Sequence, residues 1–421
     1  MVDLNKKLDF IAVALSQFFV LIVNIFLISI LTKSLSMEMF GYYTLFFTAA
    51  IFLRQILYDP ISYVIVRDCG QLAQGESVNN KVKAMNVIND GLLFWFGLIF
   101  LIAALFAYIK FNELSAVAFA LTFYLYFSSN GAGGMALAVL NILKKRRLYG
   151  AAITFEAIVK IFILLIIFKI FGSGLLESIV ALTLACVLLH ILLRLYLKRV
   201  YCSNFISSVD VGVIVKSFFI NAAPFYLPTF FVALKGVGER WVLAANVGVE
   251  DLAIFNVFFQ LGFSPVVMIF GVVQTFVAPI VYKLSAKEGG HLIRFNEFMI
   301  RLVGGVILLG VVGFFLADTI GSTILKYIVP ENYHSHLNLF PMFVVAGVLA
   351  AAVGIVHLGV VGAFEAKVAG RLMSIAMISG ISISFLSVLG WGFKGAIFGL
   401  IASNMVAFFI YSATLHKKVN L

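Results

Sequence analysis

The sequence predicts an all-α polytopic membrane protein in which twelve transmembrane helices form two pseudo-symmetric six-helix bundles. Three observations support this fold class. Of the 421 residues, 63% are hydrophobic and only 12% are charged, and the mean hydropathy is +1.10. A soluble domain needs more polar residues than this to cover its surface. In addition, lysine and arginine are concentrated in alternate loops, and two stretches of the chain resemble each other at a constant spacing.

Hydropathy gives twelve segments long enough to cross a bilayer, which requires roughly 20 mostly apolar residues. The first apolar run follows MVDLNKK and has no small-residue cleavage site, so we interpret it as a retained helix rather than a signal peptide. Several connections are only a few residues long, which makes the spans that they join antiparallel neighbours. The twelve segments, called spans 1 to 12, are 10–32, 40–66, 87–109, 114–140, 150–171, 177–197, 216–244, 251–282, 298–320, 337–360, 371–390 and 395–415.

The positive charges predict the orientation of the chain. Twenty lysines and arginines lie in one set of alternate loops, whereas the other set holds four: Lys33, Lys110, Lys326 and Lys394. Because cytoplasmic loops carry the excess of positive charge, both termini are predicted to be cytoplasmic. The net charge of +11 is then a topology signal and an attraction to anionic membrane lipid, not a nucleic-acid-binding surface.

An internal repeat predicts how the spans are grouped. Residues 33–47 align with residues 245–259 at an offset of 212, with three identical pairs, and a weaker match relates 144–150 to 364–370. One of the identical pairs is Glu38 and Glu250. An offset of six spans implies a parallel duplication, in which two similar halves are related by an axis along the membrane normal. We therefore expect one six-helix bundle over residues 1–205 and a second over residues 206–421.

Span 2 carries charge at membrane depth. Arg54 lies near its middle, and Asp59 and Pro60 follow a turn and a half later. A cation at the centre of a spanning helix costs about 2.5–3.5 kcal/mol on insertion scales, so Arg54 should face a polar interior. Pro60 cannot donate a hydrogen bond to the carbonyl of Ile56, which predicts a kink or an opening of the helix over 56–59. Such features are typical of a transport pathway; the alternative is a structural ion pair.

Span 5 contains a second pair of charges. Glu156 precedes Lys160 by four residues, which is the favourable orientation for an ion pair on one face of a helix. The pair has two interpretations. It either takes part in function or only neutralises itself so that the helix can insert.

Span 7 contains a third group, Lys235, Glu239 and Arg240, which looks like a loop by charge alone. The repeat offset places it inside the membrane, in a span that Pro224 and Pro228 predict to be bent. We expect one transport cavity lined by spans 2, 5 and 7, with a net positive charge that favours an anionic substrate group and with carboxylates that exchange partners during transport. The predicted cavity residues are Arg54, Asp59, Glu156, Lys160, Lys235, Glu239 and Arg240.

The remaining reactive residue types give weaker indications. His357 lies near mid-span and is a candidate for proton coupling, with a packing role as the alternative. His334 and His336 form an HxH without a further ligand in reach, so no metal site is predicted. The three cysteines are far apart and form neither a disulfide framework nor a metal site. The sequence contains no Walker A, HExxH or nucleophile-elbow motif, so we expect neither an enzyme nor a cofactor.

Two stretches resemble a known family. LTKSLSMEMFGYYTLF (31–46) and ERWVLAANVGVEDLAIFNVFFQLG (239–262) are similar to the L-G-x-E-x-F/V-G-x-Y links of the polysaccharide-transporter (Wzx, O-antigen flippase) branch of the multidrug/oligosaccharidyl-lipid/polysaccharide exporter superfamily. The number of spans, the duplication and the basic loop between spans 4 and 5 agree with this branch. Span 1 has no acidic residue, unlike many multidrug exporters, and lacks the arginine cluster of the lipid II flippases.

The resemblance implies a flippase that carries an undecaprenyl-diphosphate-linked oligosaccharide, an O-antigen or capsule repeat unit, across the bacterial inner membrane by alternating access. It also implies coupling to an H⁺ or Na⁺ gradient and a polysaccharide polymerase as a partner. The sugar and diphosphate would cross through a cationic cavity while the polyprenyl tail stays in the lipid. Two alternatives stay open: a multidrug/cation antiporter of the same superfamily, and a membrane protein with a structural or scramblase-like role. A purely apolar central cavity would favour the antiporter.

Overall fold

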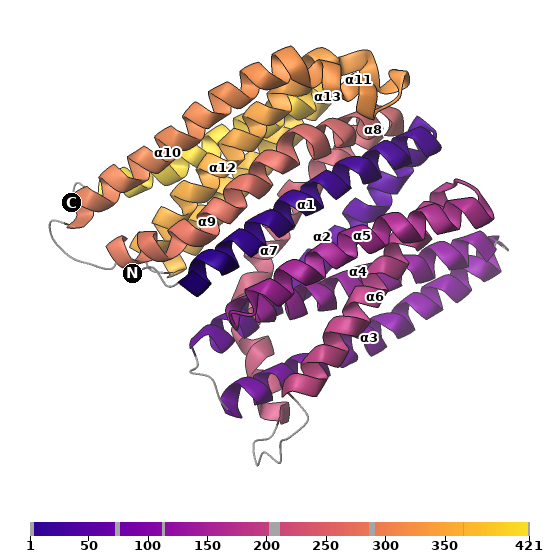
Figure 1. The fold of residues 1–421 in the computed structure, drawn as a ribbon, viewed down its shortest axis with the longest axis horizontal. Coiled ribbons are helices and arrows are strands. Elements are labelled where there is room, and N and C mark those ends of the chain that lie inside the picture. Colours follow the sequence, from indigo (N-terminus) through magenta and orange to yellow (C-terminus); the bar gives the residue numbers. More distant parts are fainter. Residues whose placement is uncertain are drawn as a thin grey trace. The chain divides into compact units, whose positions relative to one another are not determined.

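The computed structural model describes residues 4–71, 76–111, 114–201, 211–285, 291–364 and 366–419, which are almost entirely helical and contain no strand (Figure 1). The all-α fold class is therefore confirmed. The helices are α1 (Leu4–Ser34), α2 (Met37–Gln71), α3 (Glu76–Phe111), α4 (Leu114–Ile142), α5 (Arg146–Phe171), α6 (Leu175–Tyr201), α7 (Val211–Asn246), α8 (Val249–Phe258), α9 (Ser264–Ser285), α10 (His291–Leu316), α11 (Ser322–Ile328), α12 (Phe340–Ala363) and α13 (Ala366–Val419). Three short segments complete the order: the π-helical η1 (Phe259–Phe263) and η2 (Ala317–Gly321), and the 3₁₀-helical η3 (Glu331–Leu339).

The membrane-spanning segments coincide with the predicted spans. Ten stretches of the described residues are long and apolar enough to cross a membrane. One of them, Val368–His416 within α13, is bent at Gly392 and contains predicted spans 11 and 12. In addition, α4 coincides with predicted span 4. The largest difference in bounds is at α3, which begins at Glu76 rather than at residue 87, because the polar residues between them include neither glycine nor proline to end a helix.

The predicted repeat is visible in the backbone. The turn at Leu35–Ser36 separates α1 from α2, and the turn at Val247–Gly248, displaced by the same 212 positions, separates α7 from α8. At both turns the first amide after the helix donates to the carbonyl four residues earlier, at 2.9 Å. Glu38 and Glu250 each lie in the first turn of the helix that follows. The two glutamates therefore occupy corresponding positions, as the alignment predicts.

A second correspondence links the ends of the repeated halves. Gly172 lies between α5 and α6 with a φ of +87°, and Gly392 lies at the bend of α13 with a φ of +56°. They are 220 positions apart, which is the offset between 144–150 and 364–370. Side chains with a Cβ rarely adopt these backbone angles, so glycine is favoured at both turns.

The helices pack as two compact units, Met1–Val23 with Phe46–Ala233 and Asn24–Leu45 with Leu234–Leu421. In the first unit, α4 packs against α3 and α6, and α6 packs against α5; in the second unit, α12 packs against α9, α10 and α13. α4 and α6 are thus central to the first unit, and α12 is central to the second. The predicted boundary between residues 205 and 206 lies outside the described residues and stays a prediction.

The helices that contain prolines are continuous. α2 runs through Pro60, and α7 runs through Pro224 and Pro228. The opening that we considered over residues 56–59 is therefore wrong: the missing proline amide removes one hydrogen bond, and the flanking bonds keep the helix intact. Kinks at these prolines stay predictions. The π-helical η1, which the sequence analysis did not anticipate, belongs to a class of helix irregularity that is frequent at functional sites.

Candidate functional site

The part of α2 that carries Arg54 and Tyr58 lies against glycines of α4. A Cβ on Gly134 would lie 3.6 Å from Nη1 of Arg54, and a Cβ on Gly131 would lie 2.5 Å from the ring of Tyr58. Tyr58 is only 1% exposed. Small residues let neighbouring helices approach closely in membrane proteins, and here Gly131 creates the space for the ring of Tyr58.

Arg54 has a loose ion pair and one donor atom, Nε, without a partner among the described residues. Its Nη2 lies 3.5 Å from Oδ2 of Asp59 on the same helix, and the two side chains are 25% and 27% exposed. Its Nε is buried and has no hydrogen-bond partner among the described residues. Because a guanidinium carries five N–H donors in a fixed fork, Arg54 keeps capacity for a further acceptor group.

The pair predicted in span 5 is formed. Nζ of Lys160 lies 2.7 Å from Oε1 of Glu156, and both side chains are largely buried in the first unit. Cys186 on α6 donates its thiol to the same glutamate oxygen at 3.4 Å. Glu156 is thus fixed by partners from two helices.

Arg54 and Glu156 line one cavity in the first unit, of about 140 Å³, which we call the Arg54 cavity. The other residues that line it come from α4 and α6: Ser129, Asn130, Gly133, Gly134, Leu137, Cys186 and Leu189. Its wall combines two charged side chains, Arg54 from span 2 and Glu156 from span 5, with polar and apolar residues. Among the residues that the structure describes, the two charges that line the cavity, Arg54 and Glu156, each form an ion pair within their own helix, because Asp59 and Lys160 lie within reach on those helices.

The charges of span 7 lie inside helix α7, as the repeat predicts. Nζ of Lys235 donates to Oδ1 of Asn404 at 3.2 Å. Glu239 and Arg240 are buried, and Cζ of Arg240 lies 4.2 Å from the centroid of the Phe259 ring in η1, a cation–π contact. This group belongs to the second unit and the Arg54 cavity to the first, so the single cavity lined by spans 2, 5 and 7 stays a prediction.

The histidines are placed as follows. His357 lies in α12, its Nδ1 is buried without a partner among the described residues, and its ring centroid is 5.3 Å from that of Tyr411. Nε2 of His334 contacts a backbone carbonyl, whereas Nε2 of His336 lies 3.7 Å from Oδ1 of Asp251. Within the described ranges, no three metal-binding side chains come together.

The sequence analysis did not predict three residues that contribute to the Arg54 cavity or contact Lys235: Asn130, Cys186 and Asn404. A signal for the first was present, because SSN (128–130) interrupts an otherwise apolar span and is followed by GAGG. Polar groups at membrane depth need partners, which is how Asn404 meets Lys235. Cys186 gave no comparable signal because a buried thiol is common in apolar helices.

Comparisons with known proteins give the fold. No protein-family model and no curated protein matches the chain. Among solved structures, the lipid II flippase MurJ in an inward closed conformation has a TM-score of 0.71 at 13% identity, covering 98% of this chain and 89% of that one. An outward-facing multidrug resistance MATE family transporter of the MOP superfamily has a TM-score of 0.69 at 12% identity, covering 98% and 95%.

A third similar structure is the MATE multidrug transporter DinF-BH in complex with rhodamine 6G, with a TM-score of 0.67 at 14% identity, covering 97% of this chain and 95% of that one. The chain therefore has the fold of these membrane proteins over nearly its whole length.

Proposed function

We propose that this protein is a transporter that moves an undecaprenyl-diphosphate-linked oligosaccharide across the bacterial inner membrane by alternating access. One observation carries the proposal: Arg54, whose Nε has no hydrogen-bond partner among the described residues, lines a cavity inside a membrane-spanning unit. A buried cation at membrane depth is costly, and an anionic substrate group is one use for it. The sequence resemblance to the polysaccharide transporters supplies the lipid-linked oligosaccharide as the substrate class.

The loose pairing of Arg54 suits recognition of a diphosphate. Guanidinium binds phosphate through two parallel hydrogen bonds, and such charge-assisted bonds are shorter than the 3.5 Å between Arg54 and Asp59. A phosphate oxygen would therefore compete with Asp59. The tighter 2.7 Å pair of Glu156 and Lys160 would remain in place. The similar fold of a lipid II flippase supports a lipid-linked substrate.

Asp59 also offers a way to release the substrate. Once displaced, its carboxylate can return to Arg54, and Glu156 faces the same cavity from α5. Exchange of ion-pair partners between two arrangements of helices is an established form of conformational switching. Both termini would be cytoplasmic, an H⁺ or Na⁺ gradient would drive the cycle, and a polysaccharide polymerase would act on the translocated product.

The second candidate function is a multidrug/cation antiporter. Asp59 and Glu156 are carboxylates at membrane depth that could attract a cationic drug, and the similar structures include a multidrug transporter in complex with rhodamine 6G. The substrate's charge separates the two candidates, because the antiporter would use the carboxylates for binding and the flippase would use Arg54.

Reconstitution into proteoliposomes tests both candidates. One assay measures how fast a fluorescent undecaprenyl-diphosphate oligosaccharide becomes accessible on the opposite leaflet, and the other measures movement of rhodamine 6G under an H⁺ or Na⁺ gradient. The proposal predicts oligosaccharide translocation above that of protein-free liposomes and no gradient-driven movement of the dye. Dye movement without oligosaccharide translocation would establish the antiporter, and activity in neither assay would favour the structural alternative.

A further inference from the structure

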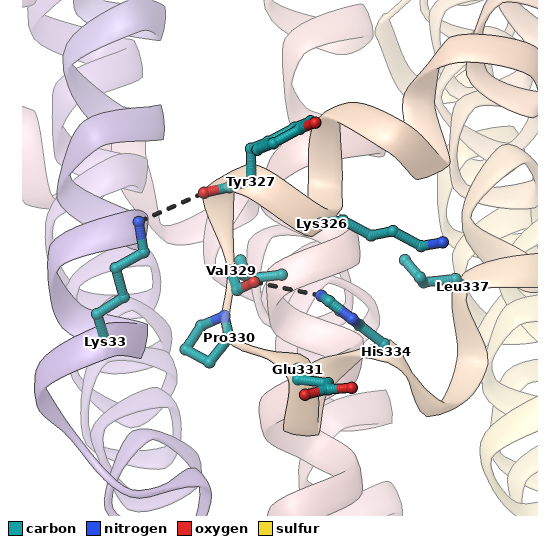
Figure 2. A pocket seen from close by; sticks show the side chains of 8 residues that line it. All are labelled: Lys33, Lys326, Tyr327, Val329, Pro330, Glu331, His334 and Leu337. Carbon is teal, nitrogen blue, oxygen red and sulfur yellow. Dashed lines mark hydrogen bonds between the residues drawn. The ribbon is translucent and has the colours of Figure 1, made fainter.

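A second pocket, of about 760 Å³, lies in the second unit where α1 ends and the chain passes from α11 to η3 (Figure 2). We call it the Lys33 pocket. The residues that line it are Lys33, Lys326, Tyr327, Val329, Pro330, Glu331, His334 and Leu337. None of them belongs to the predicted transport cavity.

Specific contacts hold the two distant segments of this pocket together. Oγ of Ser29 donates to the carbonyl oxygen of Ile328, 299 residues later, at 2.6 Å. Nζ of Lys33 donates to the carbonyl oxygen of Tyr327 at 3.4 Å, as Figure 2 shows. The same two segments also meet through aromatic rings. The ring of the fully buried Tyr333 packs edge-on against that of Phe40, with 6.2 Å between the two ring centroids. The pocket is therefore part of the packed structure of the unit.

The Lys33 pocket holds an unusual share of the positive charge of the cation-poor loops. Only four lysines and no arginine lie in these loops, and two of them, Lys33 and Lys326, line this one pocket from its two sides. Because the positive-inside rule keeps positive charge away from such loops, the presence of two lysines around one pocket needs another reason. Glu331 offsets one of the charges, which leaves a net positive pocket when His334 is neutral.

The pocket also has an apolar wall and lies at the membrane boundary. The segment Val329–Pro330 runs between Lys33 on one side and Lys326 with His334 on the other (Figure 2). The membrane span in α1 ends at Ser34, next to Lys33. The span that follows the Val329–Pro330 segment begins at Glu331. Tyr327 is 80% exposed here, as is typical of tyrosines at a membrane–water interface.

We propose that the Lys33 pocket binds the phosphate group of an anionic membrane lipid. The lysines would attract the phosphate, and Val329, Pro330 and Leu337 would contact the glycerol and the upper acyl chain. Inorganic phosphate has the same charge chemistry, but it could not use the apolar wall. The proposal concerns the cation-poor end of the spans and does not depend on what the protein transports.

Native mass spectrometry of the purified full-length protein, titrated with phosphatidylglycerol in detergent, tests this proposal. A lysine near a membrane surface strengthens binding of anionic lipid about fivefold, so Lys33→Gln and Lys326→Gln should each weaken the first binding event by about that factor. Lys394→Gln is the matched control, because Lys394 is an exposed lysine of the same loop set that lies outside the pocket. It should leave that event unchanged.

Glu331→Gln gives the opposite expectation, since removal of the carboxylate should tighten binding of phosphatidylglycerol. This variant keeps the proposal testable if a lysine variant folds poorly. Phosphatidylcholine should bind weakly, and millimolar inorganic phosphate should not displace the bound lipid. Equal losses in the Lys33, Lys326 and Lys394 variants, or displacement by inorganic phosphate alone, would overturn the proposal.

Discussion

Arg54 on α2 and Glu156 on α5 line the same cavity, yet each has its ion-pair partner on its own helix. The paired charges on each of these two helices therefore neutralise each other. The two ion pairs differ in their N–O distance, which is 3.5 Å between Arg54 and Asp59 and 2.7 Å between Lys160 and Glu156. The longer pair is the one that an anionic substrate can open at lower cost. The shorter pair keeps α5 neutral.

The Lys160→Glu substitution should impair transport far more than Lys83→Glu. It replaces a 2.7 Å ion pair with two carboxylates one helical turn apart in a largely buried place, whereas Lys83 is exposed. The measurement is oligosaccharide translocation in proteoliposomes, with the two variants matched for expression and insertion. Equal losses in both variants, or none in either, would mean that the charge of α5 serves only folding.

Exchanging the pair, as Glu156→Lys together with Lys160→Glu, separates folding from function. The exchanged pair can still form, in the less favourable order, so thermal stability should recover most of what Lys160→Glu loses. Translocation should stay low, because a cation would then replace the carboxylate that lines the cavity together with Arg54. Recovery of both stability and translocation would assign the pair a purely structural role.

The approach of α2 to α4 predicts different outcomes for two neighbouring glycines. A methyl group at Gly131 would lie 2.5 Å from the ring of Tyr58, whereas one at Gly134 would lie 3.6 Å from Arg54, an ordinary contact distance. Overpacking typically costs about 1–3 kcal/mol, so Gly131→Ala should lower the unfolding temperature and Gly134→Ala should leave it nearly unchanged. Fluorescence-detected thermal unfolding measures both. A similar temperature for the two variants would contradict the packing described for Tyr58.

Much of this fold could be predicted because membrane spans depend on local composition. The spans, the inward position of Lys235, Glu239 and Arg240, and the repeated turns all follow from hydropathy and one offset. The spacing of four residues also predicted the pair of Glu156 and Lys160, but the partner of Arg54 did not follow. A charge at membrane depth needs some partner, but whether Arg54 meets Asp59 on its own helix or Glu156 on another depends on side-chain geometry that spacing does not give. Asn130 was missed although the polar SSN (128–130) within an apolar span was a signal for it.

The paired turns at Gly172 and Gly392 predict parallel effects in the two halves. Both glycines have positive φ, and a side chain at such angles costs about 1–3 kcal/mol. Gly172→Ala and Gly392→Ala should therefore lower the unfolding temperature by similar amounts. Gly370→Ala is the control, since Gly370 lies within helix α13 with open space around a Cβ. No loss at either turn would contradict this account of the turns.

A role for His357 in proton coupling predicts a change in pH dependence. Its Nδ1 is buried without a partner among the described residues, so the ring can take up a proton only at a cost that conformational change would have to offset. His357→Gln should preserve downhill translocation and abolish its acceleration by a pH gradient. A variant that retains the gradient effect would leave His357 as a packing residue beside Tyr411.

The central claim, that Arg54 binds the anionic group of the substrate, is tested most directly by the initial translocation rate of the undecaprenyl-diphosphate oligosaccharide in matched proteoliposomes. Arg54→Ala should insert normally and lose translocation, and Arg54→Lys should retain part of it, because lysine keeps the charge and lacks the planar fork. Arg301→Ala, at a side chain that is 81% exposed, should translocate at the wild-type rate. A wild-type rate in Arg54→Ala would contradict the claim and leave Arg54 as a structural partner of Asp59.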